Sequence, residues 1–195
     1  MDVIPSHTKS VQVSLQQKMD KTKKQKIFDH PLKKMDKILI IGDAGRGKTT
    51  FAKKLSKKLK IKYYSTDNYF WEKKFSKKRD REQSSFLLKK TLKNKNRWIL
   101  EGTTTRLITP QMNNADTIIW LKHKFLTSQI IIILKRHKVR GGETKKELFK
   151  FMLYLIKIRF HKRNKKIRGL IENNKDKVII LNSFKKIDEF VKNAK

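Results

Sequence analysis

The feature that most constrains this chain is a glycine-rich loop that ends in Lys48-Thr49. Four residues separate Gly42 from Gly47, which gives the phosphate-binding pattern Gly42-Asp43-Ala44-Gly45-Arg46-Gly47-Lys48-Thr49. Glycines let backbone N–H groups point inward at a phosphate. A lysine at position 48 can reach the phosphate oxygens, and a Thr49 hydroxyl can bind the Mg²⁺ that bridges them. The loop, together with Thr50, therefore predicts a nucleotide site.

The flanks of the loop supply the structural context that this motif requires. Residues 37–41 form a short apolar run, which indicates a strand buried on both faces. After the loop, Phe51, Leu55 and Leu59 recur at four-residue intervals, which predicts one apolar face of a helix over residues 50–59. Strand, loop and helix follow one another in the order that a phosphate-binding loop needs.

Downstream, strand-like and helix-like segments alternate. We expect further strands over residues 61–65, 97–102, 116–121 and 177–181, and helices over residues 79–94 and 187–191. This alternation predicts an α/β fold with a five-stranded parallel sheet covered on both faces. Ligands of such sheets bind at the carboxyl ends of the strands. Asp67, Glu101 and residues 182–184 are therefore candidate site residues by position alone.

Net charge and cysteine content limit the classes of protein to which this chain can belong. The 195 residues carry a formal net charge of +34 and contain no cysteine. The missing cysteines exclude disulfides and suit a reducing cytoplasm. The positive charge has two interpretations, which are an evolved surface for polyanions such as nucleic acid and a lysine-rich compositional bias. The sequence leaves both open.

Two segments lie outside the predicted sheet and its helices. Residues 1–34 are polar and basic and predict a flexible N-terminal extension, which is either a tail or the product of an upstream start codon. Residues 125–174 are helical in pattern and are broken at Gly141-Gly142, directly after the basic run 135–140. This second segment is either a hinged basic lid over a phosphate or a solvated helix end. No run is long enough to span a membrane, and residues 1–34 lack the apolar core of a signal peptide.

The order of these motifs carries a resemblance over residues 35–195. The loop is followed by Asp67 with Phe70-Trp71, by residues 98–102, by residues 115–121, and by Arg136 and Arg140-Gly141. In this order the chain resembles the adenylate-kinase-like P-loop proteins described as DNA topology modulation proteins. The resemblance implies a three-layer P-loop NTPase fold of the nucleoside and nucleotide kinase kind, with a helical lid at about 125–174 and with ATP and Mg²⁺ as ligands.

The resemblance also implies roles for particular residues. Lys48 would hold phosphate, Thr49 and Glu101 would hold Mg²⁺, and Asp67 would orient or deprotonate the acceptor. Glu101 would alternatively contact the substrate. Arg136 and Arg140 match lid arginines that would stabilise the transferring phosphoryl group.

This chain departs from the resembled pattern at several positions. Where the group has Asp-Gly-Asn-Tyr, this chain has Glu101-Gly102-Thr103-Thr104. Two arginines of the group fall on Gln111 and Ile131, although Arg106 lies near the first of these and is a candidate substitute for substrate binding. Since an arginine on the transferring phosphoryl group can be worth several orders of magnitude in rate, these changes bear on catalysis more than on ATP binding.

Weaker candidates have structural alternatives. Asp67 could cap a short helix instead of serving chemistry. Phe70-Trp71 fits a core or a pocket wall better than a stacking platform for bases. His123, His137 and His161 show no metal-ligand spacing, and the basic run 159–168 is a solvated face or a phosphate contact.

The sequence therefore predicts a cytoplasmic P-loop phosphotransferase that moves the ATP γ-phosphoryl group to a small acceptor, which is a nucleotide or a related metabolite. The alternative is a nucleotide-dependent DNA-binding protein that regulates topology and has weak ATPase activity. Nucleic acid is a possible partner through charge, and no membrane partner is expected.

Overall fold

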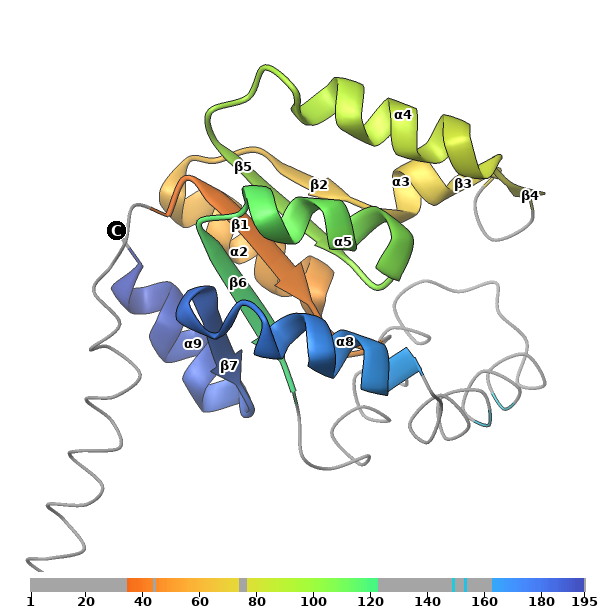
Figure 1. The fold of residues 1–195 in the computed structure, drawn as a ribbon. Helices are drawn as coiled ribbons and strands as arrows, with labels where there is room; N and C mark the ends of the chain where they lie inside the picture. Colours follow the sequence, from red (N-terminus) through yellow and green to blue (C-terminus); the bar gives the residue numbers. More distant parts are fainter. Residues whose placement is uncertain are drawn as a thin grey trace, which may run out of the picture. The chain divides into compact units, whose positions relative to one another are not determined.

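The computed structural model describes residues 35–43, 45–73, 77–122, 149, 153 and 163–194. Its organising element is a five-stranded sheet with the strand order β2-β5-β1-β6-β7 (Figure 1). All four pairings in this sheet are parallel. The strands are β1 (Lys37–Ile41), β2 (Tyr63–Ser65), β5 (Trp98–Gly102), β6 (Thr117–Leu121) and β7 (Val178–Leu181). The predicted α/β fold with a five-stranded parallel sheet is confirmed.

The central strand β1 explains why the sheet is parallel and covered on both faces. Ile38, Leu39, Ile40 and Ile41 are all fully buried, so neither face of β1 can meet water. Its register sets Ile41 opposite Gly102 of β5, and the two strands therefore end at the same level. The carboxyl ends of the strands thus form one edge, and the loop after β1 begins there.

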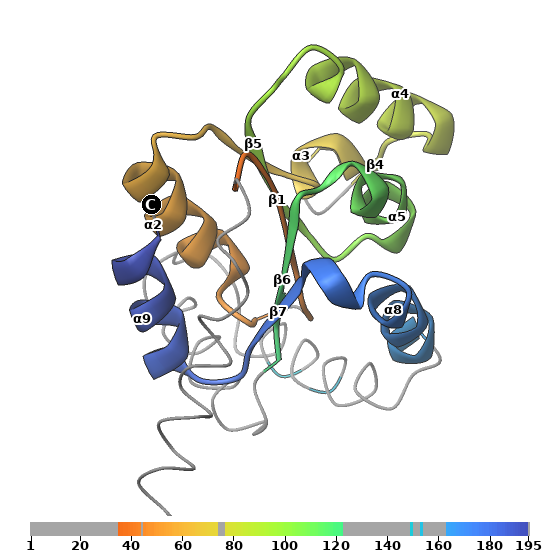
Figure 2. The same cartoon turned by 60° about the vertical axis from the view of Figure 1, so that its left-hand side comes forward.

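Helices cover both faces of the sheet, which gives three layers (Figure 2). The helices α2 (Lys48–Leu59) and α9 (Phe184–Asn193) lie on one face, and α4 (Arg81–Leu92), α5 (Thr105–Asn114) and α8 (Arg163–Glu172) lie on the other. A 3₁₀ turn, η1 (Lys175–Lys177), precedes β7. A helical turn α3 (Asp67–Phe70) and a hairpin of β3 (Trp71–Lys73) and β4 (Lys77–Lys78) follow β2.

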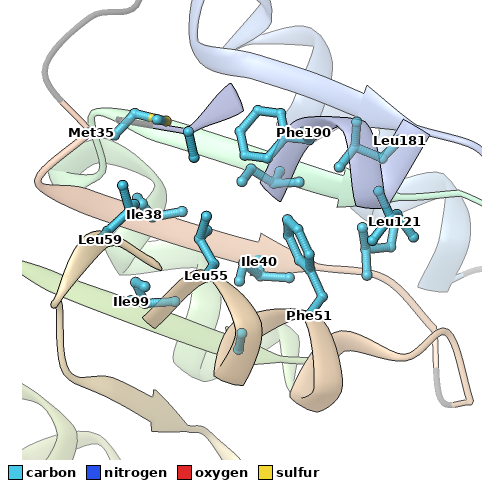
Figure 3. Close-up of a cluster of buried hydrophobic side chains, with 14 of the residues drawn as sticks. Met35, Ile38, Ile40, Phe51, Leu55, Leu59, Ile99, Leu121, Leu181 and Phe190 are labelled. Carbon is cyan, nitrogen blue, oxygen red and sulfur yellow. The ribbon is translucent and has the colours of Figure 1, made fainter. Parts of the chain in front are cut away.

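The first hydrophobic cluster joins α2 and α9 to the sheet (Figure 3). Phe51 and Leu55 of α2 are almost fully buried, and the ring of Phe51 meets that of Phe190 edge to face with centroids 6.0 Å apart. Each such side chain contributes about 1.5–3 kcal/mol through burial. The helix that follows the glycine-rich loop is therefore fixed to the sheet by its own apolar face, as the spacing of Phe51, Leu55 and Leu59 predicts.

The second cluster holds the helices on the opposite face. Leu88 and Leu92 of α4, and Leu107, Ile108 and Met112 of α5, pack with the other side chains of β1, β5 and β6. The sequence interpretation missed α5. This helix contains Pro110 in its interior and two threonines, Thr105 and Thr109, which lowers its intrinsic preference for helix. Its formation depends on the buried side chains that recur at helical spacing.

The structure also refines the predicted boundaries. β2 is shorter than predicted, and α4 begins at Arg81 because the side chain of Asp80 caps it. The sequence interpretation missed the β3–β4 hairpin as well, since its residues show no apolar alternation. The predicted extension over residues 1–34 lies outside the described residues, and so does most of the predicted lid at 125–174.

Candidate functional site

The glycine-rich loop lies between β1 and α2, at the carboxyl edge of the sheet. Gly47 is the N-cap of α2 and has a φ of 76°, a left-handed conformation that L side chains rarely adopt. No side chain caps this helix, and its first turn contains no acidic residue. The N–H groups of the first turn and the positive end of the helix therefore face the loop, which is the arrangement that binds an anion.

Lys48 and Arg46 are held against the same loop by Asp43. Lys48 is only 8% exposed, and its Nζ donates to the backbone carbonyl of Asp43 at 2.9 Å. The Arg46 guanidinium lies 3.4 Å from the Asp43 carboxylate, and Arg46 is also buried. Two cations are thus concentrated at the loop. The buried position of Arg46 had no signal in the sequence beyond its place inside the motif.

Thr49 meets Glu101 across the sheet edge. The Thr49 Oγ1 donates to Glu101 Oε1 at 3.1 Å, although 52 residues separate them. Glu101 is the fourth residue of β5 and is 3% exposed. The structure therefore brings together two predicted site residues, one from the start of α2 and one from the end of β5. A buried carboxylate beside a hydroxyl is an all-oxygen pair that suits a hard cation.

The donor set at this point fits Mg²⁺. Within the described residues, no group of three or more histidines, aspartates and glutamates could form a protein-only metal cage. Mg²⁺ does not need one, because it keeps several waters and binds through one or two protein ligands together with phosphate oxygens. Thr49 and Glu101 are the residues that would hold it.

Asp67 lies near Glu101 in the fold but does not cap a helix. It is the first residue of α3, whose N-cap is Thr66, and its own N–H contacts Ser65 Oγ at 3.4 Å. The alternative interpretation of Asp67 as an N-cap is wrong. The Thr66 N–H donates to the carbonyl of Glu101 at 2.8 Å, so α3 starts directly beside the end of β5. Asp67 is partly buried and directly follows Thr66 in the chain. Its backbone position is therefore fixed relative to the Thr49–Glu101 pair through the hydrogen bond between Thr66 and Glu101.

Gly102 makes this close approach possible. A Cβ at position 102 would lie 1.9 Å from Thr66 Oγ1 and 2.7 Å from Thr66 Cβ. No side chain fits there, which gives a physical reason for the glycine that follows Glu101. Thr66 is fully buried, and its hydroxyl has no hydrogen-bond partner among the described residues. The contact fixes β2, α3 and β5 relative to one another.

Arg106 lies in the first turn of α5, at the same edge of the sheet. Its Nη1 is buried and has no hydrogen-bond partner within the described ranges. Backbone N–H groups at the start of α4 hold the pKa of Asp80 below its usual range, and the charge of Arg106 adds to this effect. Arg106 therefore lies between α5 and the start of α4. Gln111, where the resembled group has an arginine, is buried as well. Unlike Arg106 Nη1 it has a partner, because its Oε1 accepts a hydrogen bond of 3.4 Å from the Asn114 amide.

Phe70 ends α3, and Trp71 begins β3. Their rings meet edge to face with centroids 4.9 Å apart, and Phe70 packs on the second hydrophobic cluster. Arg79 fixes the hairpin through its Nε, which donates to the Tyr69 carbonyl at 3.2 Å, and through its Nη2, which donates to that of Trp71 at 3.4 Å. The packing of Phe70 agrees with the expectation of a core position, and a role as pocket wall stays a prediction. Arg79 itself was missed, since an arginine in a basic sequence carries no distinguishing signal.

Several predicted site residues lie outside the described ranges. They are Ala44 of the loop and the predicted lid arginines Arg136 and Arg140, and Ile131, where the resembled group has an arginine, lies outside these ranges too. The three histidines at 123, 137 and 161 lie outside them as well. Within the described part of the chain, no helix is both long and apolar enough to cross a membrane.

Comparison with known proteins identifies the fold. No protein-family model matches the chain. The uncharacterized protein YqaC of Bacillus subtilis (strain 168) is 43% identical over 65 residues, which cover 33% of this chain and 36% of YqaC. The match thus spans about a third of that relative.

Two solved structures resemble most of the chain. The shikimate kinase from Acinetobacter baumannii in complex with shikimate has a TM-score of 0.50 at 17% identity, covering 82% of this chain and 91% of its own. An uncharacterized protein from Eubacterium ventriosum ATCC 27560 also has a TM-score of 0.50, at 15% identity, covering 80% of this chain and 96% of its own. The chain therefore has the fold of a P-loop kinase.

Proposed function

We propose that this chain is an ATP-dependent phosphotransferase that moves the γ-phosphoryl group of ATP to a small-molecule acceptor. The observation that carries the proposal is the 3.1 Å contact between Thr49 and Glu101, directly beside the buried Lys48. This contact lies at the carboxyl edge of a parallel sheet in a P-loop kinase fold. A glycine-rich loop without Glu101 beside Thr49 would support a proposal of nucleotide binding but not one of phosphoryl transfer.

Phosphate binding would be the role of the loop. Its residues are Gly42, Asp43, Ala44, Gly45, Arg46, Gly47, Lys48, Thr49 and Thr50. Lys48 would exchange its contact with the Asp43 carbonyl for phosphate oxygens, since both are oxygen acceptors at the same loop. Arg46 adds a second buried cation there. Together these groups provide positive charge where negative charge develops during transfer.

Thr49 and Glu101 would hold Mg²⁺. When bound, Mg²⁺ supplies charge neutralisation on phosphate oxygens. Glu101 provides a preorganised carboxylate, because β5 fixes its backbone on both sides and burial restricts its side chain. The Thr49 hydroxyl lies in the first turn of α2, so that the loop and the carboxylate keep a fixed separation.

The acceptor would lie on the other side of Glu101, toward α3 and α5. Asp67 would orient the acceptor hydroxyl or accept its proton. Arg106 would bind an anionic group of the acceptor, since its buried Nη1 has no hydrogen-bond partner among the described residues. Arg136 and Arg140 would stabilise the transferring phosphoryl group as the lid closes. We also propose that the chain belongs to the group of DNA topology modulation proteins and that it is cytoplasmic.

The test is a screen of ATP consumption by the purified full-length chain. Nucleosides, nucleoside monophosphates, sugars and small hydroxy acids are compared, and the phosphorylated product is identified by mass. We expect one acceptor class to raise the rate of ATP consumption at least about tenfold above the rate without added acceptor, when water is the only acceptor. This increase should depend on Mg²⁺. If no acceptor raises the rate above that of a Lys48→Ala variant, the phosphotransferase proposal is wrong. A slow ATPase that responds to DNA would then favour the alternative of a regulatory DNA-binding protein.

A further inference from the structure

Basic side chains are concentrated at the amino edge of the sheet, opposite the Lys48 site. We define the basic edge as nine exposed residues where α2 and α4 end and where β2 and β5 begin. They are Lys57, Lys58, Lys60, Lys62, Lys89, Lys90, Lys93, Lys95 and Arg97. Because α2 and α4 run antiparallel to the strands, both helices end at this edge (Figure 1).

The basic edge lacks the acidic residues that occur elsewhere in the chain. Residues 44–66 and residues 84–100 contain no aspartate or glutamate. An ion pair at the rim of the edge joins Arg97 Nε to Asp36 at 2.9 Å. Asp36, Asp116 and Asp176 precede β1, β6 and β7 at the amino edge, so the basic edge is confined to the side of the sheet where β2 and β5 begin. Acid-free runs also occur at residues 117–142 and 148–171, so the basic edge differs from them in that the fold brings two such runs together.

Two hydrogen bonds join the end of α2 and the starts of β2 and β5. Arg97 Nη2 lies 3.5 Å from the Leu59 carbonyl at the end of α2. The Ile99 N–H donates to the Lys62 carbonyl at 3.1 Å, so the approaches to β5 and β2 run side by side. β2 is an outer strand of the sheet, with α2 on one face and α4 on the other, so the basic ends of both helices lie on the side of the sheet that β2 borders (Figure 2).

An exposed aromatic ring lies on the same face of α4. Phe86 is 63% exposed, and Lys89, Lys90 and Lys93 follow it at intervals of three, four and seven residues. These spacings place all four side chains on one face of the helix. Bases stack on aromatic side chains while neighbouring cations bind the phosphates of the same strand.

The alternative polyanion, an acidic membrane surface, fits the edge less well. Peripheral helices bind membranes by inserting an apolar face. The apolar faces of α2 and α4 are used in the core, where Leu55, Leu59, Leu88 and Leu92 are buried. Phe86 is the one large apolar side chain that the described part of α4 exposes.

We propose that the basic edge binds single-stranded nucleic acid, with the lysines on the phosphates and Phe86 on a base. This site is separate from the nucleotide site and does not depend on phosphoryl transfer. A P-loop kinase fold would then carry a second binding function on the edge of the sheet that its chemistry does not use.

The test compares two variants that lose the same charge. The edge variant carries Lys58→Gln, Lys90→Gln, Lys93→Gln and Lys95→Gln. The control variant carries Lys78→Gln, Lys122→Gln, Lys185→Gln and Lys192→Gln, all exposed and outside the basic edge. Binding of a labelled oligothymidylate of about 16 nucleotides is measured by fluorescence anisotropy from low salt to about 0.15 M.

We expect the edge variant to lose affinity at least tenfold at about 0.15 M salt. The slope of log affinity against log salt should fall in magnitude by about 0.7 for each lysine that no longer neutralises a phosphate, or about 3 for all four. The control variant should stay within about twofold of the wild type at that salt. Equal losses in both variants would mean that the lysines act only through total charge, and the proposal would be wrong.

Phe86→Ala and a lipid probe separate the remaining outcomes. Because Phe86 is exposed, its removal leaves the core intact, and we expect a several-fold loss of affinity for the single strand with little change for a duplex of equal length. Unchanged binding of the single strand in Phe86→Ala would refute the single-strand assignment. Tight binding to phosphatidylserine vesicles without oligonucleotide binding at about 0.15 M salt would overturn the whole proposal.

Discussion

The Thr49 hydroxyl donates a hydrogen bond of 3.1 Å to Glu101, which connects the first turn of α2 to the carboxyl end of β5. The bond exists because β1 and β5 are adjacent and parallel, with Ile41 opposite Gly102. The loop that leaves β1 is thereby brought next to the residue that precedes Gly102. This arrangement links the glycine-rich loop to a fixed carboxylate and is the basis of the first prediction.

Thr49→Val should weaken the response to Mg²⁺. The valine keeps the shape of the threonine but removes the hydroxyl, so we expect the apparent Mg²⁺ affinity in ATP turnover to fall about 10- to 100-fold. The free energy of unfolding should fall by about 1–3 kcal/mol, because Glu101 loses a donor while buried. Thr49→Ser keeps the hydroxyl and should therefore retain most of the apparent Mg²⁺ affinity and most of the free energy of unfolding. An unchanged Mg²⁺ titration in Thr49→Val would argue against this metal assignment.

Lys48→Ala should abolish turnover. The side chain is the cation nearest to the loop carbonyl of Asp43, and its loss should lower kcat at least about a thousandfold, as for other cations on a transferring phosphoryl group. Lys53→Ala is the matched control, since Lys53 is an exposed lysine on the same helix. Steady-state ATP consumption measures both variants. Normal acceptor phosphorylation in Lys48→Ala would refute the mechanism.

Asp67→Asn should separate chemistry from ATP binding. The amide has the size of the carboxylate but cannot accept a proton, so we expect kcat to fall about 10²- to 10⁴-fold. Binding of an ATP analogue, measured by calorimetry, should stay close to that of the wild type. Asn68→Ala, at the exposed neighbouring position, should keep full activity. If Asp67→Asn retained the wild-type kcat, its role would be structural.

Gly102→Ala should destabilise the protein through a defined clash. The new Cβ would overlap Thr66, and we expect a loss of about 1–3 kcal/mol in the free energy of unfolding, measured by urea denaturation. The double variant Gly102→Ala with Thr66→Gly removes the atoms that clash and should recover part of the loss. A double variant no more stable than Gly102→Ala would show that the cost has another origin.

Asp80→Asn should reveal a pH-dependent contribution of the α4 cap. Hydrogen bonds from the backbone N–H groups of Gln83, Arg81 and Glu82 lower the pKa of Asp80 in the folded state. Because the folded pKa lies below the unfolded value of about 3.9, the stabilisation is present above that value and is lost as pH falls through the folded pKa. We therefore expect Asp80→Asn to unfold at lower urea than the wild type at neutral pH.

The difference between Asp80→Asn and the wild type should shrink toward zero in acid, below the folded pKa of Asp80. Asp188→Asn is the control, since Asp188 is an exposed carboxylate paired with Lys54 and should change stability little at either pH. A constant difference at all pH values would mean that the charge of Asp80 is not what stabilises the cap.

Local patterns were sufficient for the elements with strong signals. The apolar run of β1, the spacing of Phe51, Leu55 and Leu59, and the glycines of the loop are all local, and the fold confirms the strand and the helix that they predict. The helix α5 was missed because threonines and Pro110 oppose a helix locally. Only the burial of Leu107, Ile108 and Met112 against the sheet outweighs that preference.

The sequence by itself determined the glycine-rich loop between a strand and a helix and the parallel α/β fold, because these follow from residue spacing and backbone conformation over a few positions. Only the tertiary structure decided that Thr49 contacts Glu101 and that Gly102 leaves room for the side chain of Thr66. It also decided that two acid-free segments lie together at the basic edge. These relations join residues far apart in the chain. They depend on strand order and register, which the packing of both faces of the sheet fixes and which no local pattern specifies.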